Sequence, residues 1–411
     1  MKKNWIRFIG FCVIFILLLT WLNNAFSLAN PSWNGFYSLP HNSVDVVFLG
    51  NSHSLNGFQP KIVNDLLHIN SYSIGVPGEN VFITYYELRE ILKTQKPKMI
   101  VLESFTVNLT DLIIPPVIFH FTDASLWNGN KLNVLNRFLN PNNWYTAFAV
   151  MHQSIDWNHP AKAIEKNNSL DLNPFVVKKI DPDLGYSRAQ GIIASDDYEK
   201  AFQVAEANSG YSLEENLDYL QRIVELCNKE NIKLAFVTIP PIKIYGETFK
   251  YYVPFDAEQY ASQHQMDYLK FDTSDFSDLQ FNDPGHVNDF GSVAVSIQGA
   301  MKISQELDLP MDQKALAYYK TFLFNGYTIL HTEDHYSFQL NPQQTDATLE
   351  YRYTIFPYYG TENQVIQSTD WQGTSNYDFV LPEKDVYTLK IEVRNPMGDY
   401  QVNSKLVVDN R

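Results

Sequence analysis

Cysteine is scarce in this sequence. The 411 residues include only two, Cys12 and Cys227. Cys12 lies inside an apolar N-terminal run and Cys227 inside a helical pattern, so we do not expect them to pair. A disulfide framework of the kind that stabilises small secreted domains is therefore excluded. If the chain works outside the cell, this composition suits a bacterial surface better than a eukaryotic secreted scaffold.

Positive charge is also in short supply. Lys and Arg number 31 against 46 Asp and Glu, which gives a formal net charge of −15. That balance argues against nucleic acid or an anionic membrane surface as the main partner. The chain lacks a phosphate-binding glycine loop, a Cys/His zinc pattern and internal repeats. We therefore expect neither a metal nor an organic cofactor.

Apolar residues, in contrast, are abundant in this chain. They make up 45% of a sequence long enough for two domains, so a sizeable core is expected. The first long apolar run extends from Trp5 to Leu22 and is preceded by Lys2 and Lys3. About twenty such residues can span a bilayer, and the positive end stays in the cytoplasm. We expect residues 1–26 to form a single-pass anchor, with the bulk of the chain outside the cytoplasm. The alternative is a cleaved signal peptide, because residues 27–29 have a small-x-small pattern.

The stretch Val44–Pro60, VDVVFLGNSHSLNGFQP, organises the rest of the chain. Its apolar, β-branched beginning is typical of a buried parallel strand that stops at Gly50. A polar turn at residues 51–54 and then a helix are expected to follow. A serine on such a turn, Ser52, stands at the carboxyl edge of the sheet, where α/β proteins bind ligands. The alternative is that the serines of this loop merely cap the helix.

The pattern after this stretch alternates between strands and helices. Strands are expected at residues 71–74, 98–103, 232–238 and 268–271, and helices at 81–93, 212–229, 256–264 and 289–307. Such alternation predicts an α/β fold, a parallel sheet covered by helices and joined by right-handed crossovers. We assign it to one domain, residues 40–310. A less legible insertion at about 111–206 is expected to shape one side of a cleft.

Beyond residue 314 the apolar period becomes two. Residues 347–356 and 386–394 alternate apolar and polar, and residues 400–408 do so less cleanly. Turn-forming residues separate these segments, so we expect a small antiparallel β-sandwich at residues 316–411.

One set of residues in this chain matches the needs of nucleophilic serine chemistry. That chemistry requires an exposed hydroxyl, a base within reach and a carboxylate that orients the base. Ser52 supplies the hydroxyl. Asp283 and His286 stand three residues apart on a Pro-Gly turn, so one loop can present the imidazole while the carboxylate holds its other nitrogen. The sequence therefore predicts a Ser52–His286–Asp283 triad.

Three short blocks resemble those of the SGNH (GDSL-like) hydrolase superfamily. Gly50-Asn51-Ser52 is similar to its first block, with Asn51 in place of the usual Asp. Gly78 matches the oxyanion-hole glycine of the second block, and Asp283-Pro284-Gly285-His286 matches the last. The resemblance implies a three-layer flavodoxin-like sheet. It also implies an oxyanion hole formed by the N–H groups of Ser52 and Gly78.

The third block departs from that family. In the family, a Gly-x-Asn-Asp motif follows the strand that corresponds to residues 98–103. In this chain that place is taken by Glu103-Ser104-Phe105-Thr106. The oxyanion-hole asparagine is absent, which leaves Ser104 or Asn108 as substitute contacts. Loss of one such donor can cost about 2.7–4 kcal/mol of transition-state stabilisation, so activity on simple esters is expected to be poor.

Anchored proteins with this departure resemble the extracytoplasmic group that acylates or deacylates polymers, such as the teichoic-acid D-alanyl transfer and alginate O-acetylation proteins. The resemblance implies an esterase or O-acyltransferase acting on acyl groups, acetyl above all, of a surface polysaccharide or wall polymer. A transferase would need a membrane O-acyltransferase to deliver its acyl donor. His53 is then a bystander or, like Asn51, a contact of the oxyanion or the substrate. The rival interpretation is a catalytically weak binding or scaffold subunit of a polymer-acylation complex.

Two other groups of residues have the types found in metal sites. His331 and His335 stand close together with acidic neighbours, but we interpret them as a solvated loop of the β domain because no further ligands follow. Asp272, Asp275 and Asp278 lack the spacing of an EF-hand. Neither group is expected to bind a metal.

Overall fold

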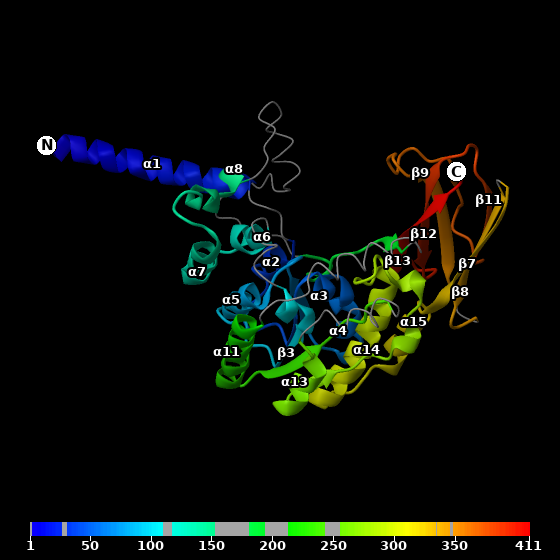
Figure 1. Ribbon diagram of the computed structural model, residues 1–411, viewed down its shortest axis with the longest axis horizontal. Helices are drawn as coiled ribbons and strands as arrows, with labels where there is room; N and C mark the ends of the chain where they lie inside the picture. Colours follow the sequence, from blue (N-terminus) through cyan, green and yellow to red (C-terminus); the bar gives the residue numbers. More distant parts are fainter. Residues whose placement is uncertain are drawn as a thin grey trace.

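A parallel five-stranded sheet forms the centre of the larger part of the chain (Figure 1). The computed structural model describes residues 2–26, 31–109, 117–152, 181–193, 213–242, 255–333, 335–345 and 348–411. The strand order is β2-β1-β3-β5-β6, and all neighbours are parallel. The strands are β1 (Val46–Gly50), β2 (Ser71–Gly75), β3 (Met99–Glu103), β5 (Lys233–Val237) and β6 (Asp267–Leu269). This is the flavodoxin-like order of doubly wound folds, and it confirms the predicted fold class.

Helices cover both faces of this sheet. The helices are α2 (Pro31–Phe36), α3 (Ser52–Gly57), α4 (Pro60–Leu67), α5 (Val81–Ile91), α11 (Glu214–Glu230), α13 (Ala257–Gln263) and α14 (Asp289–Leu307). Because successive strand residues point to opposite faces, Val46 and Phe48 pack in one core with α4 and α14. Val47 and Leu49 pack in the other core with α2, α5, α11 and α13. The molecule therefore has the expected three layers.

The region of the predicted insertion contains two described parts. Residues 117–152 form α6 (Val117–Ala124), α7 (Gly129–Phe138), the short helix η3 (Trp144–Ala147) and α8 (Ala149–His152). They pack on α2 and α5. Residues 181–193 run past α3 and end in the two-residue strand β4 (Gly191–Ile192). Residues 111–116, 153–180 and 194–206 of this predicted insertion lie outside the described residues.

The N-terminal helix α1 (Lys2–Phe26) extends away from the rest of the protein (Figure 1). Its segment Asn4–Leu22 is long and apolar enough to cross a membrane, and none of it is buried inside the protein. A signal sequence would have the same properties. The small-x-small pattern at residues 27–29 lies outside the described residues.

The C-terminal part is a sandwich of two sheets. One has the order β10-β9-β12-β13-β4 and the other β11-β8-β7, and all neighbours are antiparallel except β13 and β4. The strands are β7 (Phe324–Thr332), β8 (His335–Pro342), β9 (Glu350–Pro357), β10 (Gln367–Ser368), β11 (Asn376–Val380), β12 (Val386–Arg394) and β13 (Gln401–Asp409). The all-β architecture is as expected. Residues 313–320 are helical instead, as α15 (Gln313–Lys320), and the first strand begins only at Phe324.

The β-sandwich is not a loosely tethered module. Its inner residues belong to the same continuous core as α4 and α14, and the ring of Phe290 on α14 meets that of Phe324 at 5.4 Å. Strand β4 comes from the insertion but pairs with β13. The sandwich is thus joined to the α/β part through both side-chain packing and a shared sheet.

Candidate active site

Ser52 lies at the point where strand β1 ends. Gly50 has φ +145°, and a Cβ there would lie 2.9 Å from the Cβ of Glu103, so only glycine fits this close approach to β3. Asn51 then caps α3: its side-chain oxygen accepts a hydrogen bond from His53 N–H at 2.9 Å. A polar turn was expected at residues 51–54, but Ser52 is instead the first residue of a short helix. Ser52 lies at the carboxyl edge of the sheet as expected, but it is half-buried rather than exposed.

The structure brings together the three residues that the sequence singled out. Ser52 Oγ lies 2.7 Å from His286 Nε2, and His286 Nδ1 lies 2.9 Å from the nearer carboxylate oxygen of Asp283. Because a carboxylate only accepts hydrogen bonds, Nδ1 donates to Asp283, and in the neutral form of the ring Nε2 can accept the hydrogen bond of the Ser52 hydroxyl. This arrangement can deprotonate the serine during attack on a carbonyl carbon.

Asp283 is held in the ionised state. Partial burial alone would raise its pKa, but hydrogen bonds from His286, from Asn282 Nδ2 at 3.0 Å and from Gly285 N–H at 2.9 Å outweigh that effect. Together with the charge on His286 they lower the pKa of Asp283 to about 2. The carboxylate therefore keeps its charge, and its orienting bond to His286, throughout the neutral range.

The backbone N–H groups of Ser52 and Gly78 belong to two turns at this edge of the sheet. The Ser52 N–H is at the first position of α3, where no acceptor one turn earlier exists. Gly78 occupies the third position of a turn closed by a hydrogen bond from Glu79 N–H to Val76 C=O at 3.1 Å. Pro77 precedes it, and its φ of +76° is the value that a type II turn requires at this position. This turn follows β2, the neighbour of β1, so it lies at the same sheet edge as Ser52.

The side chains of the altered third block have other partners. Ser104 Oγ hydrogen-bonds with Thr238 Oγ1 at 2.7 Å, and Asn108 accepts a hydrogen bond from Phe255 N–H at 3.0 Å. Glu103 is fully buried and accepts a hydrogen bond from Phe105 N–H at 3.0 Å; burial raises its pKa to about 8. The Asn51 amide is also buried, and its nitrogen has no acceptor among the described residues.

The ring of His53 lies between the rings of Phe105 and His286. The ring centroids are 4.7 Å apart on the Phe105 side and 4.5 Å apart on the His286 side. Burial, followed by the charge on His286, lowers the pKa of His53 well below its usual range, so this ring is neutral. His53 therefore packs directly against the ring of His286. Phe105, in the segment that replaces the third block, was not singled out by the sequence.

Residues 181–193 hold the serine helix and the histidine loop together. Ser187 N–H donates to Leu55 C=O at 3.0 Å on the α3 side, and Gly191 N–H donates to Asn282 Oδ1 at 2.7 Å on the loop side. No motif marks this segment, so sequence reasoning placed it only within a cleft-forming insertion. Its described residues do border the Ser52 site.

Asp289 fixes the start of α14, three residues after His286. Its carboxylate is fully buried and accepts hydrogen bonds from Arg188 Nη1 at 2.9 Å, Tyr186 Oη at 2.8 Å and Asn403 N–H at 2.9 Å. These partners come from the insertion and from β13. The sequence did not predict this cluster around Asp289, because an aspartate at the start of a helix is common and indicates no distant partner.

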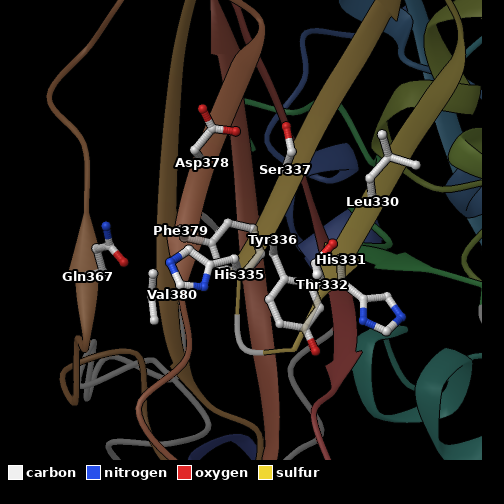
Figure 2. A pocket seen from close by; sticks show the side chains of 10 residues that line it. All are labelled: Leu330, His331, Thr332, His335, Tyr336, Ser337, Gln367, Asp378, Phe379 and Val380. Atoms are coloured by element: carbon white, nitrogen blue, oxygen red, sulfur yellow. The ribbon is translucent and has the colours of Figure 1, made fainter.

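The other candidates lie apart from this site. A pocket of about 460 Å³ in the β-sandwich is lined in part by His331 and His335, which end β7 and begin β8 rather than forming a loop (Figure 2). The rings of these histidines lie on opposite sides of Tyr336. Asp334 lies outside the described residues. Among the described residues, no three His, Cys, Asp or Glu side chains come together as a metal site.

The comparisons with solved structures find, among others, two bacterial proteins. No family model and no curated protein matches the chain. A Bacteroides fragilis protein that carries the name acylhydrolase matches 66% of this chain and 92% of its own, with 12% identity and a TM-score of 0.32. A GDSL-like lipase of Bacteroides thetaiotaomicron matches 65% of this chain and 90% of its own, with 12% identity and a TM-score of 0.29. The strand order and the site geometry of this chain, rather than these loose superpositions, support the fold assignment.

Proposed function

We propose that this protein is an extracytoplasmic serine esterase or O-acyltransferase of the SGNH type. It acts on acyl esters, acetyl above all, of a cell-surface polysaccharide or wall polymer. The observation that carries this proposal is the hydrogen-bonded chain from Ser52 Oγ through His286 to Asp283, at the carboxyl edge of the parallel sheet. Helix α1, as a single-pass anchor, holds the enzyme in the cell membrane.

Ser52 is the nucleophile of the proposed reaction. Its oxygen forms a bond to the ester carbonyl carbon while His286 Nε2 takes the hydroxyl proton, and Asp283 stabilises the imidazolium that results. The N–H groups of Ser52 and Gly78 stabilise the oxyanion. The intermediate then breaks its bond to the alcohol oxygen, which receives the proton from His286 and leaves an acyl-Ser52.

The second half of the reaction decides between hydrolysis and transfer. Water attacking acyl-Ser52 makes the protein an esterase, whereas a sugar hydroxyl makes it an O-acyltransferase. A transferase outside the cytoplasm needs an acyl donor from across the membrane, which a membrane O-acyltransferase would deliver.

The second candidate is a binding or scaffold subunit of a polymer-acylation complex. The third block of this chain favours it, because it lacks the asparagine donor and the Ser104 hydroxyl is paired with that of Thr238. The oxyanion would then have two backbone donors in place of three. That reduces catalysis but leaves the nucleophile and its base in place.

Labelling of the full-length protein separates these two functions. The detergent-solubilised chain is treated with a fluorophosphonate probe and assayed with p-nitrophenyl acetate and acetylated oligosaccharides. The enzyme proposal predicts labelling at Ser52 and turnover, both lost in Ser52→Ala and His286→Ala. An acyl group appearing on an added sugar identifies a transferase. A wild-type protein with neither a labelled Ser52 nor turnover is a scaffold.

A neighbouring serine supplies the matched control. Ser54 belongs to the same helix, but its Oγ is buried and has no hydrogen-bond partner among the described residues. Ser54→Ala removes one hydroxyl, as Ser52→Ala does, and should keep both labelling and turnover. A loss in both variants would point to damage of α3 rather than to removal of the nucleophile.

A further inference from the structure

The exposed apolar side chains of the α/β part gather in one region. Among the described residues between 31 and 320, six large hydrophobic side chains are exposed, and only Met301 lies outside residues 126–151. We call four of the others the apolar patch: Leu126, Trp127, Tyr145 and Met151, which are 63%, 46%, 60% and 56% exposed. Single exposed apolar residues are ordinary, but their concentration in one segment marks an interaction surface.

The apolar patch stands on a packed scaffold. The ring of His152 on α8 stacks on Phe119 of α6 at 3.6 Å, and its nitrogens contact Asp123 at 3.1 Å and the Thr146 carbonyl at 2.7 Å. The Trp127 ring lies 5.5 Å from that of Phe148. The exposed side chains are therefore presented by helices that are fixed to one another, so the surface is preformed.

This scaffold adjoins the membrane-spanning candidate. Helix α8 packs against α1, whose apolar segment Asn4–Leu22 ends shortly before Phe26. In Figure 1, α7 and α8 lie on the side of the protein from which α1 extends, and the β-sandwich lies at the opposite end. When α1 crosses a bilayer, the apolar patch therefore comes to the level of the lipid headgroups.

We propose that the apolar patch docks on the lipid–water interface of the membrane that holds α1. Trp and Tyr are the residues that membrane proteins place at this level, because one end of each ring is apolar and the other is polar. Leu126 and Met151 add apolar surface beside them. The catalytic part then lies against the bilayer with the β-sandwich directed away from it. This inference rests on the proposed function only through the membrane anchor, not through the triad.

A lipid surface fits these observations better than a protein partner. The bilayer is within reach of the apolar patch whenever α1 is inserted, whatever else is present. A docked protein would need a complementary surface for which the chain gives no indication. Binding of a protein in place of lipid is therefore an outcome of the test.

Lipid-quenching fluorescence tests the docking. The full chain, carrying Cys12→Ser and Tyr145→Cys, is labelled with an environment-sensitive fluorophore and placed in phosphatidylcholine nanodiscs. Cys227 stays unlabelled, because it is fully buried and burial raises the pKa of its thiol to about 12. Lipids spin-labelled near the headgroup should quench the label at 145 several-fold more strongly than a label at Met397→Cys. Met397 is the matched control, as an exposed apolar residue of the β-sandwich.

The natural Cys12 separates failure of the patch from failure of the anchor. In the wild-type chain a label on Cys12, which lies inside Asn4–Leu22, should be quenched by lipids spin-labelled deep in the acyl chain. If the label on Cys12 is quenched but the label at residue 145 is quenched no more than the label at residue 397, the docking proposal is wrong. The apolar patch then binds a protein rather than lipid. If neither is quenched, the anchor itself is wrong. Met151→Cys repeats the measurement should Tyr145→Cys unfold.

Discussion

Two histidines lie close together near Ser52, and their surroundings differ. His286 has Ser52 Oγ on one nitrogen and the Asp283 carboxylate on the other. His53 is neutral, lies between Phe105 and His286, and makes no side-chain hydrogen bond within the described part of the chain. We infer that His53 is a positioning residue whose ring supports the imidazole of His286.

Replacement of His53 by an aromatic ring tests this role. We expect His53→Phe to keep the rate of Ser52 labelling within about threefold, because a flat ring still fills the space between Phe105 and His286. His53→Ala should slow labelling by at least tenfold, about 1.4 kcal/mol, since it leaves His286 without packing on that side. Labelling by the fluorophosphonate probe at pH 7 measures both. If His53→Phe is as inactive as His286→Ala, the nitrogens of His53 take part in the chemistry.

Asp283 supplies a prediction about pH. Its pKa of about 2 lies below its usual value, so the bond to His286 is present above about pH 4 and lost only as the pH falls toward 2. Asp283→Asn should slow acylation of Ser52 by about 10³–10⁴-fold, because the amide cannot stabilise the imidazolium. Between pH 5 and 9 the variant should be slower than the wild type at every pH, because the wild-type carboxylate stays ionised throughout. A variant as fast as the wild type anywhere in that window would show that the Asp283 carboxylate is not needed there.

At the scale of elements, a largely buried ion pair joins the 181–193 segment to the start of α14. Asp289, at the start of α14, pairs with Arg188 of the 181–193 segment and with β13 through Asn403 N–H. Burial raises the pKa of Asp289 even though the charge of Arg188 opposes that effect. Loss of the cation therefore leaves a carboxylate that is costly to keep ionised.

The variant Arg188→Gln measures that cost. Removing one partner of a buried pair destabilises by about 3–5 kcal/mol, and since Arg188 is one-third exposed we expect the lower end, about 3 kcal/mol. The loss in free energy of unfolding should be larger at pH 8 than at pH 5, where Asp289 can be protonated. The double variant Arg188→Gln/Asp289→Asn should recover part of the loss. Urea unfolding of the wild type and the two variants measures these losses, and equal losses in the single and the double variant would contradict the pairing.

Glu103, at the end of β3, makes the stability of the sheet edge depend on pH. Because burial raises its pKa to about 8, the folded state holds a proton that the unfolded chain releases above about pH 4.5. Its contribution to stability is therefore complete at low pH and falls as the pH rises from 4.5 to 8, by at most about 1.4 kcal/mol per pH unit. Glu103→Gln should flatten this part of the stability profile. Unfolding free energies between pH 5 and 8 that decline equally in both proteins would assign the decline to other groups.

At the scale of the whole molecule, periodicity predicted most of the α/β architecture. Short apolar runs that end in glycine or a polar turn gave the strands of the central sheet, and each run matched a strand within a few residues. The spacing of Asp283 and His286 indicated a single loop that serves both, because three residues of a turn are enough to bring their side chains together. Both patterns lie within short stretches of the chain, and a single sequence shows such patterns directly.

Contacts that depend on distant segments were not predictable. Residues 181–193 have no periodic pattern, yet they bridge α3, the histidine loop and β13. The packing of Phe105 on His53 joins the ends of two strands that lie 52 positions apart in the chain, and nothing in either segment indicates it. The strands β7 and β8 were not predicted, because the polar run between Leu330 and Tyr336 at their turn is typical of a loop.

The continuous core makes a final prediction about how the protein unfolds. Phe290 of α14 contacts Phe324, and Tyr400 of the β-sandwich donates a hydrogen bond to Gln59 beside α4 at 2.9 Å. Because these contacts bury apolar surface from both parts, removal of the sandwich would expose the outer side of α4 and α14. We expect calorimetry of the full chain in detergent to show one cooperative transition. Tyr400→Ala should lower that single midpoint, whereas two transitions, with only the later or the earlier one shifted, would show that the parts fold independently.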